Sequence, residues 1–65
     1  MADDDLDAIR QAFADLTGLF EDAALIASEG QGFKTLEGGC RQFRRISKAM
    51  DRIRRRLVIL ERRLR

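Results

Sequence analysis

The sequence predicts an all-α protein, an antiparallel hairpin of two helices that pack like a coiled coil. Three observations lead to this fold class. Apolar residues recur at alternating spacings of three and four in both halves of the chain, which is the pattern of helices wound around one another. The chain contains no proline. A segment with two glycines, residues 29–32, separates the halves, and a chain reversal is expected there.

The first helix is expected over about residues 4–29. Its main apolar stripe consists of Leu6, Ile9, Phe13, Leu16, Phe20, Ala23 and Ala27. We expect this stripe to face the second helix. A further stripe runs beside it and would stay available to a partner; its residues are Ala12, Leu19 and Ile26.

A turn is expected over residues 30–34. Gly30 can close the first helix in the left-handed conformation, and Gly32 lets the chain reverse. The second helix is then expected over about residues 35–64. Gly39 fills the one gap in its apolar stripe, which consists of Leu36, Phe43, Ile46, Met50, Ile53, Leu57, Leu60 and Leu64.

The register of the hairpin follows from pairing the two stripes. In an antiparallel hairpin the numbers of facing residues have a nearly constant sum. Here the sums are 62 and 63, as for Ile9 with Ile53 and for Phe20 with Phe43, and the midpoint falls at Gln31. This register places each residue of the first stripe opposite a position of the second stripe, while Leu60 and Leu64 overhang without partners.

A two-helix hairpin buries only one seam. For a chain of 65 residues, a single core rarely supplies more than about 3–5 kcal/mol. We therefore expect a homodimer, as a four-helix bundle, or an obligate protein partner. The expected interface consists of apolar residues that the hairpin leaves uncovered: Leu19, Leu25, Ile26, Val58, Ile59, Leu60 and Leu64.

The net charge of +2 hides opposite charges in the two halves. Residues 1–29 carry eight acidic side chains and one base, Arg10, whereas residues 33–65 carry twelve bases and three acids. The guanidinium group suits both phosphates and carboxylates. The second helix is therefore predicted to contact phosphates or an acidic partner through Arg41, Arg44, Arg45, Lys48, Arg52, Arg55, Arg56, Arg62 and Arg63.

The composition argues against catalysis and metal binding. The chain has no histidine and a single cysteine, Cys40, which excludes histidine acid–base chemistry, sites built on paired Cys or His, and an internal disulfide. Cys40 is expected to be a small, semi-buried apolar residue. We expect no catalytic residue, metal ion, cofactor, small-molecule substrate or membrane span. The acidic start and the lone thiol favour a cytoplasmic location.

The leading interpretation is a non-enzymatic interaction or regulatory protein, such as an inhibitor, an antitoxin or a chaperone-like adaptor. It would bind a protein partner through an apolar stripe and the Arg-rich helix. One alternative is a small DNA- or RNA-binding protein whose dimer lays two basic helices on phosphates. Another alternative is an accessory subunit of a larger enzyme.

Overall fold

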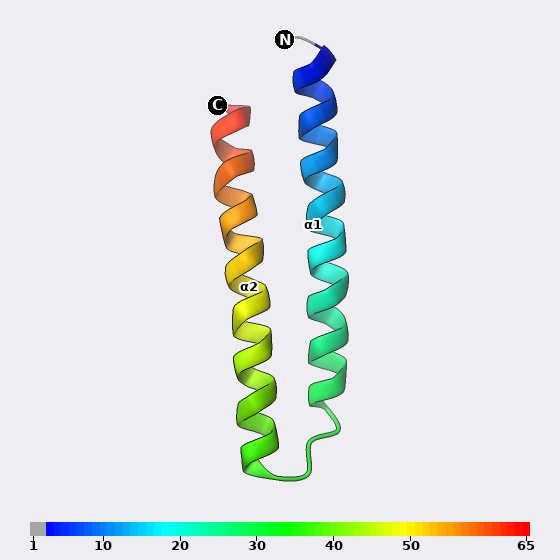
Figure 1. The fold of residues 1–65 in the computed structure, drawn as a ribbon, viewed down its shortest axis with the longest axis vertical. Helices are drawn as coiled ribbons and strands as arrows, with labels where there is room; N and C mark the ends of the chain where they lie inside the picture. The colour runs from blue at the N-terminus through cyan, green and yellow to red at the C-terminus, as the bar shows by residue number, and fades with distance from the viewer. Residues whose placement is uncertain (1–2) are drawn as a thin grey trace.

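The computed structural model describes the backbone of residues 3–65 and the side chains of residues 5–65. Helix α1 spans Asp3–Gly30 and helix α2 spans Leu36–Leu64. The helices run antiparallel and side by side, and a short connector joins them at one end (Figure 1). The helical hairpin is thus confirmed, and its helices begin and end within one residue of the expected bounds. The side chains of Asp3 and Asp4, counted above among the acids, lie outside the described residues.

The connector is held by the ends of both helices. Backbone N–H groups of Gln31 and Gly32 each donate to a carbonyl oxygen three residues earlier, at 3.1 Å, and so continue the last turn of α1. Thr35 is the N-cap of α2: its backbone is extended, and its hydroxyl oxygen accepts a hydrogen bond from the N–H of Gly38 at 3.0 Å. This bond satisfies one of the free donors at the start of α2.

The left-handed conformation expected for Gly30 is wrong, because no glycine among the described residues has a positive φ. Gly30 serves packing instead. A Cβ atom built on Gly30 would lie 3.1 Å from Cγ of Gln42, so the missing side chain lets α2 come close to the end of α1.

The core lies in the single seam between the helices. Its buried residues are Leu16, Ala23, Ala49, Ile53 and Leu60, and partly buried residues pack against them: Ile9, Ala12, Leu19, Ile26 and Ile46. The seam thus takes positions from both apolar stripes of α1. Alanines within it allow the helix axes to approach closely.

The predicted register is wrong. Cross-hairpin partners have residue numbers that sum to 68 for Ile26 with Gln42, to 71 for Asp15 with Arg56 and to 74 for Glu29 with Arg45, not to 62 or 63. Both stripes of α1 have helical spacing, so periodicity does not decide which one faces α2. The structure places alanines and aliphatic side chains in the seam and leaves the phenylalanine rings outside it.

Within residues 3–65, neither helix contains a segment long and apolar enough to cross a membrane.

Candidate functional site

Large apolar side chains remain exposed along one long side of the hairpin. We call this set the apolar flank. On each helix its members are seven residues apart, and they are Leu6, Phe13 and Phe20 of α1 and Leu36, Phe43, Met50, Leu57 and Leu64 of α2.

Both helices contribute to the same side because they are antiparallel. Phe13 comes one residue after Ala12 of the core, and Met50 comes one residue after Ala49. A step of one residue from a core position turns the side-chain direction by the same angle on each helix. Because the two helices run in opposite directions, both steps lead to the same side of the seam. In agreement, Ala27 of α1 and Phe43 of α2 line one shallow groove.

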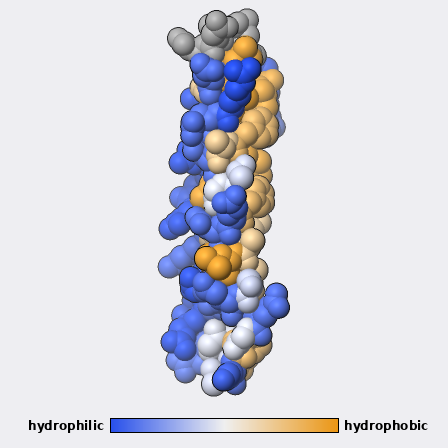
Figure 2. All heavy atoms as spheres, turned by 90° about the vertical axis from the view of Figure 1, so that its right-hand side faces the viewer, coloured by the Kyte–Doolittle hydropathy of each residue, from blue (hydrophilic) through white to orange (hydrophobic). Residues whose placement is uncertain are grey.

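Figure 2 views the hairpin from the side of α1. Hydrophobic residues run along one edge of the molecule for most of its length, and hydrophilic residues occupy the opposite edge. The apolar flank residues are between 39% and 82% exposed. Scattered apolar residues are normal on a protein surface, whereas a continuous apolar strip marks an interaction site.

Phe33 extends the apolar flank at the turn end of the molecule. Its ring lies against Gly39, where an added Cβ atom would be 3.3 Å from Cδ2 of the ring. Together with Leu36 and Phe43, it lines a shallow apolar concavity whose rim includes Cys40. Cys40 is exposed, so the expectation that it is semi-buried is wrong.

One residue predicted at the interface lies elsewhere. Leu60 is only 5% exposed, because the actual register turns its side chain toward the opposite helix. Leu19 and Ile26 pack against the core but are only partly buried, so their contact with a partner stays a prediction. The remaining predicted interface residues are exposed, and they are Leu25, Val58, Ile59 and Leu64.

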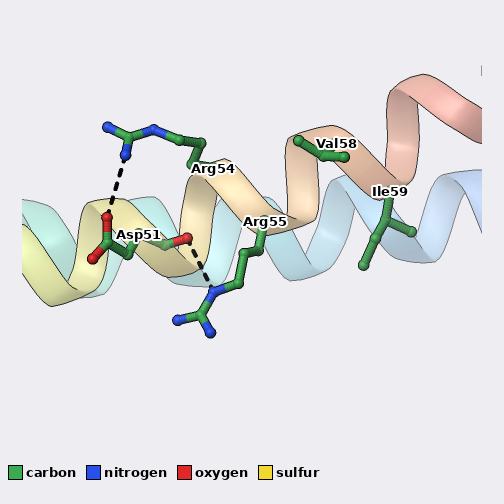
Figure 3. A pocket seen from close by; sticks show the side chains of 5 residues that line it. All are labelled: Asp51, Arg54, Arg55, Val58 and Ile59. Atoms are coloured by element: carbon green, nitrogen blue, oxygen red, sulfur yellow. Dashed lines mark hydrogen bonds and ion pairs between the residues drawn. The ribbon is translucent and has the colours of Figure 1, made fainter.

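Val58 and Ile59 lie outside the apolar flank, on the outer surface of α2 (Figure 3). One turn earlier, Nη1 of Arg54 donates to the Asp51 carboxylate, and Nε of Arg55 donates to the Asp51 carbonyl oxygen, each at 3.3 Å. The two arginines point in opposite directions from the helix (Figure 3). The result is a shallow surface on one helix, with apolar residues beside charged ones.

A basic strip runs along α2 on the side of the seam opposite the apolar flank. Arg45 comes one residue before Ile46 of the core, and Arg52 comes one residue before Ile53, whereas the flank residues follow core positions. We call the strip the basic face. Its members are exposed and three, four or seven residues apart: Arg41, Arg45, Lys48, Arg52, Arg55 and Arg62.

The remaining predicted phosphate contacts flank this strip. Arg44 and Arg63 are exposed on α2, and Arg56 lies 3.8 Å from a carboxylate oxygen of Asp15 across the hairpin.

Acidic residues of α1 neutralise the basic face at one position. Nη1 of Arg45 donates to a carboxylate oxygen of Glu29 at 2.8 Å. This bond, with a second from Gln42 and the positive charge of Arg45, lowers the pKa of Glu29 below its ordinary value. Among residues 5–65, no carboxylate lies within 4.0 Å of the charged groups of the other members: Arg41, Lys48, Arg52, Arg55 and Arg62.

The bulky members of the apolar flank were assigned from sequence to the hairpin's own seam. A signal for their actual place is present in the sequence. Alternating spacings of three and four also connect Ile9, Ala12 and Leu16, and alanines favour close helix contact. The seven-residue spacing of Phe13 and Phe20 then describes a neighbouring strip.

Comparison of the chain with models of protein families, with curated proteins and with solved structures gives no match.

Proposed function

We propose that the protein is a non-enzymatic helical interaction protein that works as a homodimer, a four-helix bundle closed over the apolar flank. The observation that carries this proposal is the repeat of large apolar residues on one side of both helices. It supports a role in which the protein acts by occupying a surface, as an inhibitor, antitoxin or adaptor does.

The core of one hairpin supports the need for a partner. Among residues 5–65 it contains five buried residues, and two of these are alanines, Ala23 and Ala49. Alanine removes little apolar surface from water, so the seam offers less than the roughly 3–5 kcal/mol that limits small single cores. The apolar flank therefore provides the burial that the hairpin lacks.

The size of the apolar flank fits a specific interface. A phenylalanine side chain can bury about 150–250 Å². Phe13, Phe20 and Phe43 are 50–67% exposed, which leaves roughly 250–450 Å² of open aromatic surface. With the five aliphatic residues added, the flank approaches the about 800 Å² that each partner contributes to a standard interface.

A second copy is the occupant that the pattern favours. Seven-residue spacing suits a helical partner, in which side chains of one helix fit between those of the next. Two copies related by a two-fold axis present the same apolar surface to each other. The basic face lies on the opposite side of the seam, so pairing leaves it in water and avoids repulsion between the copies.

Light scattering and sedimentation test the proposal. We expect the purified protein to have twice the mass of the 7.5 kDa chain, and its thermal midpoint to rise with concentration because folding and association are linked. A stable, helical monomer at high micromolar concentration would refute the dimer.

A pair of variants tests the interface itself. Phe20→Asp puts a charge on the apolar flank and should dissociate the dimer, whereas Val58→Asp makes the same change on the outer surface of α2 and should preserve it. The opposite result would place the interface on the outer surface of α2. An enzyme subunit or other obligate partner would be indicated by a wild-type chain that becomes helical only after co-expression with that partner.

A further inference from the structure

We propose that the basic face of α2 binds the phosphate backbone of double-helical nucleic acid, without reading its sequence. The inference goes beyond the proposed assembly. It does not depend on the dimer, because each hairpin carries a complete basic face.

The basic face is long and straight. Arg41 and Arg62 are 21 residue steps apart on one uninterrupted helix, or about 31 Å at 1.5 Å per residue. Neighbouring members are about 5–6 Å apart where they are three or four residues apart. A double helix carries one negative charge per about 3.4 Å of axis on each strand, so one strand offers a charged line of matching length. Ile59, which lies four residues after Arg55 and three before Arg62, leaves one uncharged position in the basic face.

The charges of the basic face are available to a ligand. Of its six members, only Arg45 forms an ion pair within the described part of the chain. The Nε atom of Arg55 is occupied by the carbonyl oxygen of Asp51, while its terminal nitrogens project from the helix (Figure 3). Five of the six members are arginines, whose planar group forms paired hydrogen bonds with phosphate oxygens.

The acidic residues of α1 set the width of this surface. Asp15, Asp22 and Glu29 each come one residue before a seam position of α1, which places them along the same edge of the hairpin as the basic face. They confine the positive charge to a strip one helix wide. Such a strip fits a single line of phosphates better than a broad anionic surface.

The scarcity of aromatic residues along the basic face points to the duplex rather than to single strands. The chain has no tryptophan or tyrosine, and Phe13, Phe20 and Phe43 belong to the apolar flank. Phe33, whose ring lies against Gly39, comes near the basic face only at its Arg41 end. Single-stranded binding relies on stacking of bases on aromatic rings. Contacts to the backbone alone position a protein on the duplex without specifying bases.

Fluorescence anisotropy of a labelled 30-base-pair duplex, titrated with the full chain at several salt concentrations, tests the inference. We expect the protein to bind the duplex at 50 mM salt. As the salt concentration rises, the logarithm of the binding constant should fall linearly with the logarithm of the salt concentration, with a slope of about −4 to −5 for five phosphate contacts. No binding at 50 mM salt would overturn the inference. So would binding of equal strength to unlabelled poly-glutamate, which would indicate an acidic protein as the partner.

Charge-reversal variants test whether the basic face is the surface that binds the duplex. Lys48→Glu with Arg55→Glu should weaken duplex binding by about tenfold or more. The matched control is Arg54→Glu with Arg65→Glu, which changes the same charge at arginines already paired with Asp51 and Glu61 on α2. An equal loss from both pairs would refute the assignment to the basic face. Circular dichroism verifies that each variant is folded.

The dimer and the nucleic-acid surface can fail separately. If Phe20→Asp yields a helical monomer that still binds duplex with the salt slope expected for one basic face, both proposals are supported. A wild-type monomer that binds duplex would refute the dimer and support the basic face. A wild-type dimer that does not bind duplex would support the proposed dimer and refute phosphate binding by the basic face.

Discussion

Gln42 crosses the hairpin and binds the main chain of the opposite helix: its Nε2 donates to the carbonyl oxygen of Ile26 at 2.8 Å. The same side chain accepts a hydrogen bond from Arg45 at 3.2 Å, and Arg45 in turn binds Glu29. This polar cluster lies at the turn end, where Gly30 leaves little apolar surface. It specifies the register there, which apolar spacing alone does not.

Gln42→Ala should lower the free energy of unfolding by about 1 kcal/mol, the usual net worth of a hydrogen bond. Urea unfolding followed by circular dichroism measures the change. Gln11→Ala serves as the control, because the Gln11 side chain donates to Asp15 on its own helix rather than across the hairpin. Equal effects of the two changes would show that the bond across the hairpin contributes nothing.

The stability of the hairpin should fall in acid through Glu29. Its pKa is lowered from 4.5, first by the hydrogen bond from Arg45 and then by that from Gln42. A carboxylate with a lowered folded pKa contributes stability that is fully present above the unfolded value and is lost as pH falls through the folded one. The difference in thermal unfolding between wild type and Glu29→Gln should therefore shrink as the pH falls from 6 toward 3. A constant difference between pH 6 and 3 would contradict this.

Gly18→Ala should stabilise the protein by about 0.5–1 kcal/mol, because glycine within a helix is costly. An added Cβ atom at Gly18 meets no atom within 4 Å. At Gly39 the same change brings Cβ to 3.3 Å from the Phe33 ring, so Gly39→Ala should gain less or destabilise. Thermal unfolding compares the two variants. Equal gains in stability from the two variants would show that the Phe33 ring moves aside without cost.

Ile53→Ala should leave the chain largely unfolded at room temperature. Ile53 is the most buried residue of the core, at 2% exposed, and such a truncation costs about 2–5 kcal/mol. That loss is comparable to the whole stability expected of so small a core. Helical circular dichroism should drop, whereas Val58→Ala, at an exposed position, should preserve it. A fully helical Ile53→Ala variant would contradict the assigned core.

Both helices could be predicted from the sequence, because helical spacing and the absence of proline act locally. The register in which the two helices pack could not be predicted. Ala12 and Phe13 are adjacent on α1, and both belong to strips with helical spacing. The choice between them depends on how closely the two helices approach, a property of the pair that no single helix reveals.

The dependence on register also explains which residues of the candidate site were predicted correctly from the sequence. The basic residues were found because a charge is exposed in almost any register, as Arg41 and Lys48 illustrate. Apolar interface residues depend on the register, so Leu60 was expected outside and lies inside, while Phe43 was expected inside and lies outside.

The apolar flank also restricts how the length of this protein can change. One residue inserted into α1 would rotate everything beyond it by about 100°, and Phe13 and Phe20 would no longer share a side. Seven residues inserted into each helix would lengthen the strip by about 10 Å and keep its direction. Length variants of this hairpin that still assemble should therefore differ by whole repeats, added to both helices together.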